Sequence, residues 1–160
     1  MFDDNDDELP NPEKLPIYQK SREIYHLVHK ISELIPDENE MLQTTKRFML
    51  EDAGIIGAKI SGAEAVGLYD IKMENAAIVR KAARDMILHC RELEMYNFKE
   101  IHYLNLIREA IEELRILFVG WVKTFDPWEY IIDRWGLFNP PGVNADDHDP
   151  DDDIPFNPPF

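Results

Sequence analysis

The chain has 160 residues, of which 44% are apolar, and a formal net charge of −15 at pH 7. A domain of this size can bury a hydrophobic core, whereas its acidic balance disfavours nucleic acid as a partner because phosphates are repelled. Its one cysteine, Cys90, excludes an internal disulfide and favours a reducing cytoplasmic compartment.

The first predicted element is an acidic arm, residues 1–14. Residues 1–13 carry six acidic side chains and no basic one, and they lack the apolar stretch of a secretory signal peptide. Further along, the apolar run 116–122 is far shorter than the ~20 residues needed to span a bilayer. We therefore expect no membrane association, and the acidic ends favour basic protein partners.

Residues 15–125 are predicted to form an all-α, up-down-up-down bundle of four helices. Proline is absent from 37 to 126, and apolar residues recur three and four positions apart. Pro16, Asp37 with Glu40, and Asp70 are the expected helix starts. The four helices are expected over about 16–34, about 37–66, from Asp70 to a turn at 96–99, and from that turn to Phe125.

A short aromatic fifth helix is predicted over 126–138. Asp126, Pro127 and Glu129 form a strong helix start, and Gly136 is a suitable stop. The segment is too apolar to leave in water, so we expect it to pack on the bundle or on a neighbouring subunit. Its apolar side chains are Trp128, Tyr130, Ile131 and Trp135.

The stretch 51–67, "EDAGIIGAKISGAEAVG", contains four glycines within one predicted helix. Each glycine costs about 1 kcal/mol relative to alanine in a helix interior. Gly54, Ala58, Ser61 and Ala65 fall on one face, so another helix can approach closely. Tight packing inside the bundle is one interpretation, and a subunit contact or a kink is the other.

Residues 17–36, "IYQKSREIYHLVHKISELIP", and 61–83, "SGAEAVGLYDIKMENAAIVRKAA", carry a family resemblance, the second through Ala63, Glu64 and Glu74. Both are similar to bacterial four-helix-bundle proteins of the 23S rRNA intervening-sequence type, which include accessory proteins of diversity-generating retroelements. The likeness covers about 15–125 and implies a cyclic oligomer, commonly a pentamer. Nucleic-acid binding by the basic retroelement relatives is disfavoured here, because residues 14–125 have a net charge of −1.

Arg84 and His89, in "RDMILH" (84–89), are the candidate catalytic residues. Their spacing resembles that of HEPN ribonucleases, in which an arginine and a histidine, usually from two subunits, activate the ribose hydroxyl and stabilise the phosphate. The same spacing arises readily by chance in a chain of this composition, so a surface arginine and a partly buried histidine are favoured. The ribonuclease is kept as an alternative.

Two further candidate sites are weaker. Glu23 and His26 form one Glu-x-x-His motif of the di-iron kind, but the chain has no second copy, so we predict no metal and no cofactor. Lys72, Arg80 and Arg84 give the third helix a basic side that could bind nucleic acid. Acidic residues interleave with them, which favours a salt-bridged solvent face.

The predicted tail, residues 139–160, ends in "DPDDDIPFNPPF" (149–160). Acids followed by Ile-Pro-Phe are similar to the C-terminal tip of bacterial single-stranded-DNA-binding proteins, which presents this peptide to repair and replication proteins. The resemblance implies a partner with an apolar pocket and a basic rim. Here "NPPF" follows, so the terminal carboxylate is on Phe160. The candidate partner-binding residues are Asp151, Asp152, Asp153, Ile154, Pro155, Phe156 and Phe160.

Three interpretations of the tail stay open: a solvated tail, a peptide that docks on another protein, and a segment that folds onto its own or an adjacent subunit. We expect a non-enzymatic, oligomeric, cytoplasmic scaffold or adaptor that engages a protein partner through this peptide, with DNA-processing proteins as one candidate class. The alternatives are the ribonuclease and a nucleic-acid-binding accessory factor.

Overall fold

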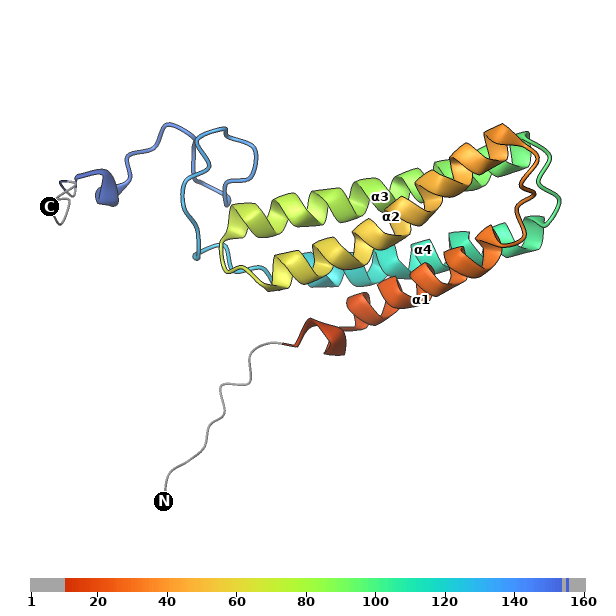
Figure 1. The fold of residues 1–160 in the computed structure, drawn as a ribbon. Helices are drawn as coiled ribbons and strands as arrows, with labels where there is room; N and C mark the ends of the chain where they lie inside the picture. The colour runs from red at the N-terminus through yellow and green to blue at the C-terminus, as the bar shows by residue number, and fades with distance from the viewer. Residues whose placement is uncertain (1–10, 154, 156–160) are drawn as a thin grey trace, which may run out of the picture.

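A computed structural model describes residues 11–153 and residue 155 (Figure 1). All regular secondary structure in this part of the chain is helical, which confirms the all-α prediction of four long helices. The helices are α1 (Pro16–Ser32), α2 (Glu40–Glu64), α3 (Tyr69–Met95) and α4 (Ile101–Val122), with 3-10 turns η1 (Pro12–Lys14) and η2 (Pro150–Asp153). Within the described ranges, no helix has both the length and the apolar character needed to cross a membrane.

The four long helices form a ring in which each packs on two neighbours. Short loops turn the chain back after α1, α2 and α3, so that successive helices run in opposite directions (Figure 1). Helix α1 contacts α2 and α4, and α3 also contacts α2 and α4. The seam between α1 and α2 therefore lies on the opposite side of the bundle from the seam between α3 and α4. The α3–α4 pair packs less extensively than the α2–α3 pair.

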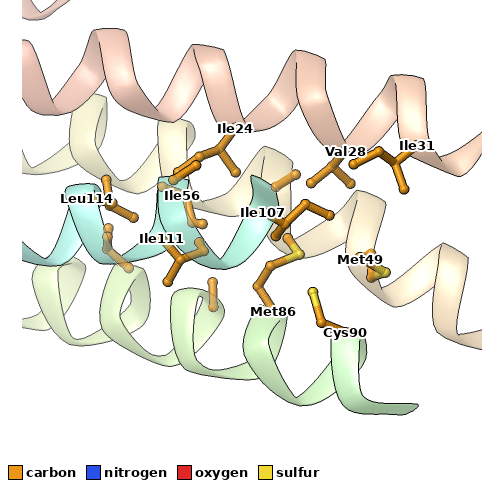
Figure 2. Packing of buried hydrophobic residues seen from close by; sticks show 14 of the residues in the cluster. Ile24, Val28, Ile31, Met49, Ile56, Met86, Cys90, Ile107, Ile111 and Leu114 are labelled. Carbon is orange, nitrogen blue, oxygen red and sulfur yellow. The ribbon is translucent and has the colours of Figure 1, made fainter. Parts of the chain in front are cut away.

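A hydrophobic core fills the centre of this ring. Apolar side chains from all four helices point inward and meet there (Figure 2). The labelled residues are Ile24, Val28 and Ile31 from α1, Met49 and Ile56 from α2, Met86 and Cys90 from α3, and Ile107, Ile111 and Leu114 from α4. Their spacing of threes and fours along each helix puts them on one face, which is why this pattern predicts the bundle.

The turn predicted at 96–99 closes α3 with a left-handed cap. Asn97 has φ 66°, a conformation that asparagine tolerates better than most residues. The Phe98 N–H then donates to the Leu93 carbonyl at 2.9 Å, and the Phe98 ring is buried in the core. This turn ends α3 and directs the chain into α4.

Two helix starts differ from the sequence prediction. Asn39, and not Asp37, caps α2, because its side-chain oxygen accepts from the N–H groups of Met41 and Leu42 at 3.0 and 3.2 Å. Helix α3 begins at Tyr69 with Leu68 at the cap position, so Asp70 lies inside the first turn. An acidic residue there still interacts favourably with the positive end of the helix dipole.

The predicted fifth helix over 126–138 is wrong: these residues form turns and extended chain. A helix would need the Asp133 N–H to donate to the Glu129 carbonyl. That carbonyl instead accepts from the Tyr69 N–H at 2.9 Å, and the Asp133 N–H donates to Asn139 Oδ1 at 2.7 Å. Partners outside the segment have replaced the helical hydrogen bond at both its ends.

Candidate interaction site

The segment 126–139 leaves large apolar side chains in water at one end of the bundle. Trp128 is 87% exposed, Trp135 96% and Leu137 74%. Of the two expectations for this segment, packing on its own bundle is therefore wrong for these side chains, while packing on a neighbouring subunit stays a prediction. The segment's contact with the bundle includes the bond from Tyr69, and Glu129 lies so close to Gly67 that a Cβ there would overlap its carboxylate.

Asp133 organises the segment as a compact loop. Its carboxylate accepts from the N–H groups of Trp135, Leu137 and Phe138 at 3.0, 2.9 and 2.8 Å. These bonds, that of Phe138 first, lower the pKa of Asp133 below its ordinary value, against the opposing effect of desolvation. Gly136, with φ +71°, supplies the turn that brings the three N–H groups together.

The described part of the tail bonds to this loop. Arg134 donates to the carbonyls of Ala145 and Asp147 at 3.0 and 2.8 Å and pairs with Asp152 at 3.0 Å. His148 Nε2 lies 2.9 Å from an oxygen of Asp153. In Figure 1 the blue segment with η2 lies beyond the end of the bundle and does not run along its side.

Four of the predicted partner-binding residues are described, and all four are exposed: Asp151, Asp152, Asp153 and Pro155. Ile154, Phe156 and Phe160 lie outside the described residues, as do residues 1–10 of the predicted arm. The structure thus presents the acidic part of the candidate peptide to solvent, and this part follows the exposed apolar loop in the chain after residues 140–150.

An apolar groove of about 440 Å³ runs between α3 and α4. The small side chain of Ala83 on α3 leaves space between the two helices. Ile87, Phe118 and Val119 line this space together with it. Ile87 and Val119 are exposed and Phe118 is partly buried. The groove is therefore an apolar surface that this chain leaves open to solvent.

Four arginines surround the groove: Arg80, Arg84, Arg108 and Arg115. Two of them have partners on the chain, since Arg108 pairs with Glu94 and Arg115 with Glu112, each at 2.6 Å. Arg80 and Arg84 are exposed and have no ion-pair or hydrogen-bond partner among residues 11–153. They give the groove an uncompensated positive rim in a strongly acidic protein.

His89 lies on another face of α3 and is held by α2. Its Nε2 is 2.9 Å from Asp52 Oδ2, and its Nδ1 is 3.3 Å from Glu92 Oε2. Burial raises the pKa of Asp52, against the opposing effect of the His89 hydrogen bond. Arg84 faces the α3–α4 groove, so a single chain does not bring the two predicted catalytic residues together.

Lys72, proposed for nucleic acid, is committed to the bundle. Its Nζ donates to the Ala63 carbonyl at 2.8 Å, near the end of α2, and lies 5.2 Å from the centre of the Phe125 ring. This hydrogen bond and the cation–π contact tie α2, α3 and the end of the bundle together. Of the three predicted nucleic-acid residues, Arg80 and Arg84 share the groove, while Lys72 has a structural role.

Two observations on the described residues bear on catalysis and metal binding. Burial raises the pKa of the Cys90 thiol to about 11, so it is a poor nucleophile at neutral pH. No group of three His, Cys, Asp or Glu side chains in the described ranges is arranged to hold a metal ion. Glu64, singled out by the family resemblance, accepts from Trp121 Nε1 at 2.7 Å and joins α2 to α4.

Sequence reasoning missed the groove. Arg80 with Arg84, and Arg108 with Arg115, are four and seven positions apart, so each pair marks one helix face. Nothing in either helix alone indicates that the two faces adjoin. No family model, curated protein or solved structure matches this chain.

Proposed function

We propose that the protein is a non-enzymatic helical scaffold that binds a protein partner through its acidic C-terminal segment. The observation that supports this most directly is that Trp128, Trp135 and Leu137 are exposed in the loop that precedes this segment, whose described acids are exposed as well. When a partner covers large exposed apolar side chains, the burial stabilises the complex by about 25 cal/mol per Å² of apolar surface removed from water. Tryptophan is also enriched among residues that dominate protein interfaces.

The chemistry of this segment specifies the kind of partner. Asp151, Asp152 and Asp153 of the segment favour a basic rim that speeds encounter, while Trp128 and Trp135 of the preceding loop favour an apolar pocket. DNA-processing proteins are one candidate class, from the resemblance of residues 151–156 to the tip of single-stranded-DNA-binding proteins. A homo-oligomer in a reducing cytoplasm belongs to the same proposal.

Affinity capture from cell lysate tests the proposal, with the full chain and a version that ends at Asp149 as baits. We expect specific proteins on the full chain and their loss from the shortened one. A full chain with Trp135→Ala and Leu137→Ala should retain less of the same proteins. Equal recovery on the full and shortened baits would contradict the proposal, as would RNA cleavage that disappears in His89→Ala.

A further inference from the structure

We infer that the groove between α3 and α4 is a binding site for the C-terminal segment, residues 149–160, of a second copy of the chain. The contact is directional, because one copy supplies the segment and the next supplies the groove. It uses the same segment as the proposed function but requires no outside protein. The two proposals can therefore fail separately.

The first step is the fit of the apolar surfaces. The groove has a volume of about 440 Å³, within the range of pockets that hold small ligands or a few side chains. Ile87, Phe118 and Val119 offer it an apolar lining that no described residue covers. The segment 149–160 contains isoleucine, phenylalanine and proline, which suit such a lining.

The second step is charge. Arg80 and Arg84 form an unpaired positive rim on the groove, and residues 149–153 carry four aspartates. Arginine forms two parallel hydrogen bonds with a carboxylate, so it discriminates acids better than a lysine would. Asp151 is exposed, and its carboxylate has no partner among the described residues.

The third step separates a second copy from the chain's own tail. Arg84 lies fifteen residues into α3, about 22 Å along the helix from its start at Tyr69. Asp152 pairs with Arg134 of the loop at the bundle end, whereas Asp153 pairs with His148 of the tail itself. Phe156 follows Asp153 by at most about 11 Å of extended chain, which is too short to reach the level of Arg84 on its own α3. Because η2 lies beyond the end of the bundle (Figure 1), a neighbouring copy can offer the segment without breaking these pairs.

Sedimentation velocity of the full chain tests the inference. The native chain should associate as its concentration rises, and salt should weaken the association. Phe156→Ala, and the double change Arg80→Glu with Arg84→Glu, should each weaken it by about tenfold or more. Both arginines are exposed, so the folded bundle should keep its circular dichroism spectrum.

Arg22→Glu is the matched control. Arg22 is an exposed arginine on α1 that lines a separate depression between α1 and α2, on the opposite side of the bundle. Its reversal changes the net charge by the same amount per residue without touching the α3–α4 groove. This variant should associate as the native chain does.

A mixing experiment tests the direction of the contact. The Arg80→Glu, Arg84→Glu variant keeps an intact segment, and Phe156→Ala keeps an intact groove. At a concentration just sufficient for the native chain to associate, each variant alone should remain monomeric, whereas the mixture should form one-to-one pairs.

Three results would overturn the inference: a native chain that stays monomeric at every concentration, association that survives in both variants, or a mixture that forms no pairs. If the native chain stays monomeric and chemical cross-linking joins its C-terminal segment to its own groove, the inference of a second copy is likewise overturned. Partner capture by the segment in lysate, without self-association, would leave the proposed binding of a protein partner standing.

Discussion

Asp133 illustrates how one side chain redirects a segment that its neighbours favour as a helix. Asp126 and Pro127 do begin a turn, because the Asp126 carboxylate accepts from the Trp128 N–H at 2.9 Å. Asp133 then captures three N–H groups with its carboxylate, while its own N–H bonds to Asn139. Short polar side chains compete with helical hydrogen bonds in this way, so this apolar segment forms a loop and not a helix.

The lowered pKa of Asp133 makes this loop sensitive to pH. Because the pKa of Asp133 is lowered in the folded chain, its ionised carboxylate stabilises the loop fully at any pH above the ordinary carboxyl pKa of about 3.9. This stabilisation is lost as the pH falls through the lower pKa of the folded chain. We expect the hydrogen-exchange protection of the Phe138 amide to fall at low pH. Asp133→Ala should remove the protection at neutral pH, whereas Asp126→Ala should leave it unchanged. Equal protection in Asp133→Ala and the native chain would refute this role.

At the scale of elements, the helix ends are decided by particular side chains and not by the apolar pattern. Asn39 begins α2 and Asn97 ends α3, because asparagine both caps helices and tolerates the left-handed region. Within α2, Gly57 and Gly62 are also positions where the identity of one residue matters. A Cβ at these positions would lie 3.2 Å from Ser21 on α1 and from Asn75 on α3, respectively. Gly57 and Gly62 thus allow close packing of α2 on α1 and α3. The predicted face is different: Gly54 has open space beside it, and Ala58 and Ala65 are exposed, so tight packing inside the bundle is wrong for that face, while a subunit contact there stays a prediction.

Asn39→Ala should lower the free energy of unfolding by about 1 kcal/mol, because two N–H groups at the start of α2 lose their acceptor. Asp37→Ala is the matched control two residues earlier. Since Asp37 does not cap the helix, its removal should change stability by less than about 0.5 kcal/mol. Chemical denaturation of both variants measures the difference. The opposite order would place the cap at Asp37.

At the scale of the whole molecule, stability resides in the ring of four helices. The core cluster draws on α1 to α4 together with Ile35, Phe98 and Phe125, and its members all precede residue 126. The exposed loop and the described tail add polar bonds among themselves but no core residues. The part of the chain that folds the bundle is thus distinct from the part that we propose binds a partner.

Two isoleucines of α4 test where the stability resides. Ile107 is fully buried and Ile116 is 60% exposed. Ile107→Ala should cost about 2–5 kcal/mol, because it leaves a cavity in the core. Ile116→Ala should change the free energy of unfolding by about 0.5 kcal/mol or less. Similar melting temperatures for the two variants would contradict the packing shown in Figure 2.

The number of long helices and the faces they bury follow from the spacing of apolar residues along the chain. Helical spacing is a local property, so Ile24 with Val28, or Ile107 with Ile111 and Leu114, mark a core-facing stripe without knowledge of their neighbours. The turn at 96–99 could also be predicted, because its length and polarity are local.

Tertiary structure alone decided the rest, because it depends on contacts between distant residues. The Glu129 carbonyl bonds to Tyr69, sixty residues earlier, and this contact helps prevent the fifth helix. The faces that carry Arg84 and Arg115 become one groove only when α3 and α4 pack side by side. Likewise, Arg84 and His89 are close in sequence but face different helices. Sequence spacing fixes the direction of a side chain on its helix, but packing decides what it meets.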